Sequence, residues 1–190
     1  YLAEFDRLGT KRPGFDTRRR EAIDRFAELG FPTGREENWR FTDLAPFLEV
    51  AFNPAGKSDL GLVRGLAQGP LKGLQMTFVD GVFSPELSSS VRPEGLDLGS
   101  LSRPPEAVAA EVGRHADFSR NAFTALNTAL FQDGAYIHVR RGARIAAPIH
   151  VLFLCSHGTE PFMTHPRVFI LAEEGSAAVV GAEAAKKYGE

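Results

Sequence analysis

A short unit that occurs twice near the end of the sequence constrains the fold more than any other feature. It occupies residues 138–143 and again 171–176, and each copy joins an apolar strand to two like charges, a glycine and a second strand. The glycines of the two copies, Gly142 and Gly175, lie 33 residues apart. Repeated units of this kind indicate stacked rungs, in which each rung buries its apolar face against its neighbours. The repeat therefore predicts the first rungs of a β-solenoid.

Composition narrows the class of protein. Of the 190 residues, 43% are hydrophobic and 24% are charged, which is typical of a globular chain with one domain and a smaller appendage. The formal net charge of −2 argues against a general nucleic-acid binder, which needs a basic excess. The single cysteine, Cys155, allows no intrachain disulfide, and no run approaches the roughly 20 apolar residues of a membrane span. We expect a cytoplasmic protein that contacts neither nucleic acid nor membrane.

Local patterns divide the chain into three segments. Residues 1–52 read as a helical region with an aromatic anchor segment, because apolar residues recur at helical spacing before Pro32. Residues 53–115 read as a connecting segment that contains a hairpin, since Asp80-Gly81 separates two β-prone runs. Residues 116–190 read as a helix followed by the start of a solenoid core. No capping segment follows the last strand, so we expect a fragment of a longer protein whose strand near Val180 has an unpaired edge.

The strand expected at residues 149–155 is apolar on both faces. Leu152 and Leu154 alternate with the apolar residues that should face the core. The outer face of this strand should therefore be covered. The helix expected at residues 119–131 is one candidate for the cover, and a partner subunit is another.

Four short segments resemble the SufB/SufD family of iron–sulfur cluster assembly proteins. Residues 32–44, with Glu37-Asn38-Trp39-Arg40-Phe41-Thr42, resemble the N-terminal signature of that family. Residues 78–83 resemble its hairpin, residues 123–134 the junction between helix and solenoid, and residues 165–167 the entry to a later rung. The chain looks more like SufD than SufB, because the N-terminal cysteine motif usual in SufB is absent from it.

The resemblance implies an α+β protein with an N-terminal helical region followed by the first rungs of a right-handed parallel β-helix. It also implies a scaffold subunit that pairs with a SufB-like paralogue and a SufC-like ATPase, and it leaves a homodimer open. An iron–sulfur cluster and reduced flavin are implied for the whole complex, and we expect this part to bind no cofactor. The family's docking and cluster-proximal residues lie toward its C-terminus, so no functional residue is transferred to this chain.

Few side chains offer chemistry of their own. We interpret Cys155, inside an apolar strand, as a buried hydrophobe in preference to a ligand or persulfide carrier. His138 and His150 form a metal-binding pair if stacked rungs bring them together, but no third ligand stands at a fixed spacing, so we favour a surface role. The spacing of the remaining histidines is not that of metal ligands; these are His115, His157 and His165.

Other polar and aromatic residues have structural explanations that we prefer. Trp39 and Arg40 mark either a ligand-stacking site or an aromatic anchor, and we favour the anchor. Asp80-Gly81 and Asp133-Gly134 are turn residues. Glu173 and Glu174 are adjacent at a turn and should point in different directions.

We therefore predict no catalytic residue, no metal site and no enzyme activity, and leave any cofactor-binding residue unassigned. The leading hypothesis is a non-catalytic scaffold of the SUF iron–sulfur assembly complex. The alternatives are a β-helix enzyme that acts on polysaccharide, which needs paired carboxylates on outward positions, and a solenoid module for protein interactions.

Overall fold

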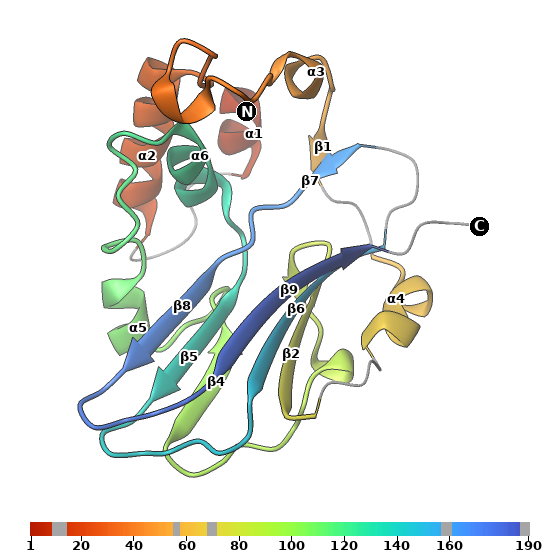
Figure 1. Ribbon diagram of the computed structural model, residues 1–190, viewed down its shortest axis with the longest axis vertical. Coiled ribbons are helices and arrows are strands. Elements are labelled where there is room, and N and C mark those ends of the chain that lie inside the picture. Colours follow the sequence, from red (N-terminus) through yellow and green to blue (C-terminus); the bar gives the residue numbers. More distant parts are fainter. Residues whose placement is uncertain (9–14, 55–57, 68–71, 157–160, 187–190) are drawn as a thin grey trace.

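Two β-sheets face each other, and helices pack at one end and on the outer faces of the sheets (Figure 1). The computed structural model describes residues 1–8, 15–54, 58–67, 72–156 and 161–186. The helices are α1 (Leu2–Leu8), α2 (Asp16–Leu29), α3 (Ala45–Leu48), α4 (Leu60–Ala67), α5 (Glu106–Glu111) and α6 (Ala122–Leu130), with 3-10 turns at Glu37–Trp39 and Pro85–Leu87. The strands are β1 (Asn53–Pro54), β2 (Leu74–Val79), β3 (Val82–Phe83), β4 (Leu96–Ser100), β5 (Ala135–Val139), β6 (Ile149–Cys155), β7 (Phe162–Met163), β8 (Val168–Ala172) and β9 (Val180–Lys186).

The strands pair in both orientations. One sheet has the order β3-β2-β6-β9 and the other has the order β4-β5-β8, while β1 and β7 form a small separate pair. β6 lies parallel to β2 and β9, and β5 lies parallel to β8. β3 runs antiparallel to β2, and β4 runs antiparallel to β5.

The expected right-handed parallel β-helix is wrong. The protein is a mixed α/β structure whose sheets contain both parallel and antiparallel pairs, and none of them closes on itself in the part that is described. The physical reason is that the repeated unit is present in two copies only, so it orders only the strands that flank those copies. It pairs β5 with β8, where Ala135 lies opposite Val168, but it sets no orientation for β3 and β4.

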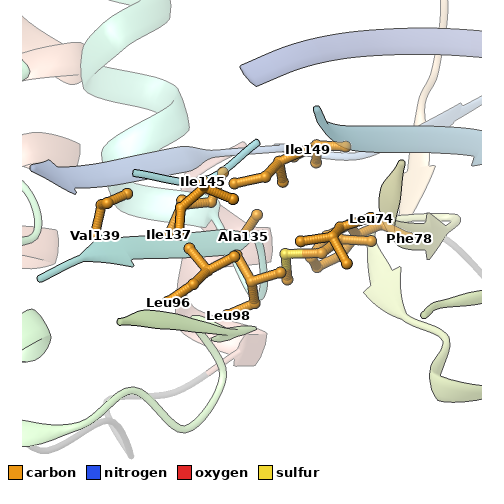
Figure 2. Close-up of a cluster of buried hydrophobic side chains, with 11 residues drawn as sticks. Leu74, Phe78, Leu96, Leu98, Ala135, Ile137, Val139, Ile145 and Ile149 are labelled. Atoms are coloured by element: carbon orange, nitrogen blue, oxygen red, sulfur yellow. The ribbon is translucent and has the colours of Figure 1, made fainter. Parts of the chain in front are cut away.

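The main core lies between the two sheets. Leu96 and Leu98 of β4 and Ile137 of β5 point toward Ile149 of β6 and Phe78 of β2 (Figure 2). These side chains are all 8% exposed or less, because alternate residues of each strand point to the same face. The inward residues of one sheet thus meet those of the other in a single apolar layer.

A second cluster joins the N-terminal helices to α6. Ile23 and Phe26 of α2 pack against Ala125 and Ala129 of α6, where small side chains allow close approach of the two helices. Arg19 of α2 is 3% exposed, and its Nε donates to the backbone carbonyl of Ala129 at 2.8 Å. The hydrogen bond offsets part of the cost of burying this guanidinium.

The outer face of β6 is covered, as its apolar pattern predicts, but by a different helix from the one expected. Leu152 and Leu154 are 6% and 3% exposed. They pack against Val63 and Ala67 of α4, while α6 packs on α2 at the other end of the molecule. The helix expected at residues 119–131, one of the two candidates for the cover, is therefore not the cover.

Candidate functional site

We call the side on which β8 and β9 end the two sheets the open side. β8 is the last strand of one sheet and β9 is the last strand of the other. The predicted free edge near Val180 is therefore present among the residues that the structure describes. Ile170 of β8 is 48% exposed, and Val179, just before β9, is 67% exposed. Because Ile170 lies opposite the fully buried Ile137, the apolar layer between the sheets continues to this open side.

Two stacked glycine turns hold this edge in place. Gly142 and Gly175 adopt φ angles of 70° and 72°, a conformation that strongly favours glycine. The N–H of Gly142 donates to the carbonyl of Glu174 at 3.0 Å, and the N–H of Ala177 donates to that of Ala143 at 2.9 Å. The two copies of the repeat thus lie side by side, and the second turn is positioned by the first.

A cross-strand charge cluster lies on the outer face beside these turns. His138 of β5 stands between two carboxylates, with its Nε2 donating to Glu173 at 2.7 Å and its Nδ1 3.8 Å from Asp97 of β4. Arg140 donates to Asp97 from two nitrogens at 2.8 and 3.0 Å. The hydrogen bond from His138, reinforced by the N–H of Arg141, holds the pKa of Glu173 below its ordinary value. The cluster ties β4, β5 and the end of β8 together.

The structure does not bring the candidate metal pair together. His138 and His150 alternate with inward residues of different sheets, so they point away from the core on opposite sides of it. The Nε2 of His150 lies 3.3 Å from the carbonyl oxygen of Lys72. No group of three or more potential metal ligands occurs in the described part of the chain.

The other histidines have unrelated surroundings. His115 is exposed and stacks on Phe169 at 6.5 Å between ring centres. His165 is largely buried before β8, and this burial lowers its pKa to about 4, against a smaller opposing effect of Glu4. His157 lies outside the described residues.

Cys155 is the last residue of β6, and its position is less buried than predicted. Its side chain is partly exposed, so burial as a full core residue is not what the structure shows. In the register of the sheet, Cys155 lies opposite Lys186 of β9. Cys155 thus lies near the open edge of the sheet.

The aromatic anchor and the Asp80-Gly81 turn behave as predicted, whereas Asp133-Gly134 leads directly into β5 without a turn, so that prediction is wrong. Trp39 packs on Phe123 of α6 with ring centres 5.2 Å apart, while Arg40 lies 4.5 Å over the exposed ring of Phe41. Asp80 and Gly81 adopt φ angles of 50° and 84° in the hairpin between β2 and β3.

The acidic residues predicted at turns also have structural partners. The Asp133 carboxylate accepts hydrogen bonds from the N–H of Phe83 and the hydroxyl of Ser100, which fixes the entry to β5. The Glu173 carboxylate binds His138 and the backbone N–H of Arg141, whereas the Glu174 carboxylate binds the guanidinium of Arg141.

Two features of this region were not predicted from the sequence. Asp97 lies in a stretch that reads as irregular, and its only signal is the alternation of the two leucines that flank it in β4. The helix α4 lies in the segment expected to be a connection.

Comparison with known proteins finds similarity to one family. Residues 69–151, which run from just before β2 into β6, match the model of the SufBD protein N-terminal region. The comparisons support the SufB/SufD family for this chain. It is 28% identical over 188 residues to an iron–sulfur cluster assembly SufBD family protein of Synechocystis, covering 95% of this chain and 40% of that relative. It is 27% identical over 188 residues to the iron–sulfur cluster assembly protein SufD of Escherichia coli, covering 93% of this chain and 40% of that relative.

The SufB/SufD resemblance read from the sequence is therefore confirmed, including its likeness to the N-terminal part of SufD. This chain spans about 40% of the length of the two curated relatives. No helix among the described residues is long and apolar enough to cross a bilayer.

Proposed function

We propose that this protein is a non-catalytic scaffold subunit in the cytoplasmic assembly of iron–sulfur clusters. Its similarity to the SufB/SufD family supports this role, because both relatives carry iron–sulfur cluster assembly in their names. In this proposal the chain supplies binding surfaces to other subunits and performs no chemical step itself. The cluster and reduced flavin belong to the whole complex.

The partners that we propose are a SufB-like subunit and a SufC-like ATPase. The observation that supports a subunit contact is the open side formed by β8 and β9, where backbone groups and the apolar layer at Ile170 are accessible. A free strand edge pairs readily with a strand from another chain or from a further part of a longer chain.

Co-purification tests the scaffold role. The protein is expressed with a tagged SufB-like subunit and a SufC-like ATPase, and the mass of the eluted complex is measured by light scattering. We expect a stable complex that contains all three chains. Isolation of the protein without either partner, at concentrations of about 10 μM, contradicts the proposed role, since obligate assemblies hold together at such concentrations.

One variant at the open edge and one control variant on α4 test whether the edge makes the contact, independently of the scaffold role. Val179→Lys places a charge beside β9 on the open side, whereas Leu62→Lys makes the same kind of change on α4, where Leu62 is 49% exposed. If the edge contacts the partner, Val179→Lys weakens complex formation and Leu62→Lys does not. Equal yields of complex from the two variants reject the edge as the contact and leave the scaffold role standing.

A further inference from the structure

A groove runs along the outer face of the three-stranded sheet beside α5, on the side of that sheet away from the core. Its volume is about 490 Å³, within the range of about 300–1,000 Å³ found for sites that bind small molecules. One wall is apolar and consists of Pro105, Ala107 and Val108, at the start of α5 and just before it. The opposite wall is the outward face of β4 and β5, which contributes Tyr136 among others.

Tyr136 gives the groove a flat aromatic surface. Its ring lies directly over Gly99 of the neighbouring strand, because a Cβ atom at position 99 would come within 2.5–2.6 Å of the ring atoms. The ring therefore lies against the backbone of β4, and Tyr136 also lines the groove. Flat apolar ligands stack favourably on aromatic rings placed in this way.

Arg92 gives the groove an unneutralised positive charge. Its Nη1 donates to the backbone carbonyls of Ser89 and Val91 at 2.6 and 3.0 Å, which fixes the guanidinium at the rim. No carboxylate pairs with Arg92 among the described residues, whereas the nearby Arg140 is paired with Asp97. The charged side chains that line the groove thus have an excess of one positive charge when His138 is neutral.

Tyr136 and Arg92 line the same groove, so one ligand can contact both. Burial and the Asp97 carboxylate raise the pKa of the Tyr136 hydroxyl, and the Arg92 charge opposes that rise. Guanidinium groups recognise planar or tetrahedral anions through paired N–H donors, and Arg92 has nitrogens beyond Nη1 available for this. Because the chain as a whole has a net charge of −2, the positive excess is a local property of this groove.

We propose that this groove binds a small molecule that combines a flat apolar ring system with one anionic group. The ring system stacks on Tyr136 against the apolar wall at α5, and the anionic group pairs with Arg92. The site is independent of the open edges of β8 and β9, so it goes beyond the scaffold role and stands or fails separately from it.

A fluorescence titration with two related probes tests the proposal. The first probe is 8-anilinonaphthalene-1-sulfonate, which has flat apolar rings and one sulfonate, and the second is N-phenyl-1-naphthylamine, which lacks the sulfonate. The purified protein is compared with Arg92→Gln, Arg92→Lys and a control, Arg64→Gln, which removes an arginine 54% exposed on α4. Urea unfolding of each variant checks that the fold is retained.

We expect Arg92→Gln to weaken binding of the sulfonate probe about tenfold, because a charge-assisted hydrogen bond is lost. The same variant should change binding of the uncharged probe less than about twofold. Arg92→Lys should restore only part of the affinity for the sulfonate, because lysine keeps the charge but lacks the paired donors. Arg64→Gln should match the unchanged protein with both probes. Equal affinities of the unchanged protein and Arg92→Gln for the sulfonate probe overturn the proposal, as does an equal loss with both probes.

Discussion

Gly134 sits where the backbones of two strands meet so closely that no side chain fits. It precedes β5, and a Cβ atom at this position would lie 3.0 Å from the carbonyl carbon of Arg167 and closer still to its oxygen. That oxygen accepts a hydrogen bond of 2.9 Å from the N–H of Ala135, which starts the pairing of β5 with β8. Since the obstacle is backbone in a sheet, Gly134→Ala forces the two strands apart.

The expected loss of stability follows from these contacts. Overpacking of a buried site costs about 1–3 kcal/mol. Weakening of the Ala135 to Arg167 hydrogen bond adds about 0.5–1.5 kcal/mol. We therefore expect Gly134→Ala to lower the free energy of unfolding by about 2–4 kcal/mol. For a chain of this length the melting temperature should fall by roughly 5–15 °C.

Urea and thermal unfolding monitored by circular dichroism measure this loss. The matched control is Gly65→Ala, which makes the same exchange inside α4, where a Cβ atom meets nothing within 4 Å. Alanine is the better helix former, so the control should gain about 0.5–1 kcal/mol. A Gly134→Ala protein as stable as the original to within about 0.5 kcal/mol refutes the close approach, because the cited packing cost is at least about twice that.

Two further predictions concern buried groups. Leu154→Ala should lower the free energy of unfolding by about 2–5 kcal/mol, because Leu154 is 3% exposed under α4. The control Leu62→Ala, at a 49% exposed position, should change the free energy of unfolding by about 0.5 kcal/mol or less. Equal effects of the two variants in urea unfolding argue against the packing of α4 on β6. The pKa of His165 falls from 6.5 to about 4 on folding. Between pH 6.5 and pH 4 the imidazole is therefore protonated in the unfolded chain and neutral in the folded chain. Stability should consequently drop by about 2–3 kcal/mol between pH 7 and pH 4.5, and His165→Gln should remove that drop while His115→Gln, at an exposed position, should keep it. The opposing effect of Glu4 is included in that pKa, and identical pH profiles of unfolding for His165→Gln and the original protein contradict the burial of this imidazole.

Features set by neighbouring residues could be predicted from the sequence. The strands at Ala135–Val139 and Ile149–Cys155 and the Asp80-Gly81 hairpin follow from alternation and from a turn that needs positive φ. The 33-residue repeat correctly places Gly142 beside Gly175. The division of the chain into segments at residues 52 and 115 stays a prediction.

Features set by distant contacts could not be predicted in this way. The helix α4 contains Gly61 and Gly65, which weaken any helical signal, and it is stabilised because Val63 and Ala67 bury against β2 and β6. The antiparallel direction of β4 depends on a pairing of Leu98 with Ile137 across a stretch that has no repeat. The groove beside α5 combines side chains from separate elements, so no local sequence pattern predicts it.

The spacing of the two stacked turns also bears on the chain entropy that strand pairing costs. Pairing of β5 with β8 joins residues 33 apart, and pairing of β6 with β9 joins residues 31 apart, whereas Leu74 of β2 lies 75 residues from its partner Ile149. Closing the longer loop costs about 0.7 kcal/mol more in chain entropy than closing the shorter ones. Among the parallel pairings of the two main sheets, those of β5 with β8 and of β6 with β9 therefore cost the least chain entropy, and the pairing of β2 with β6 costs the most.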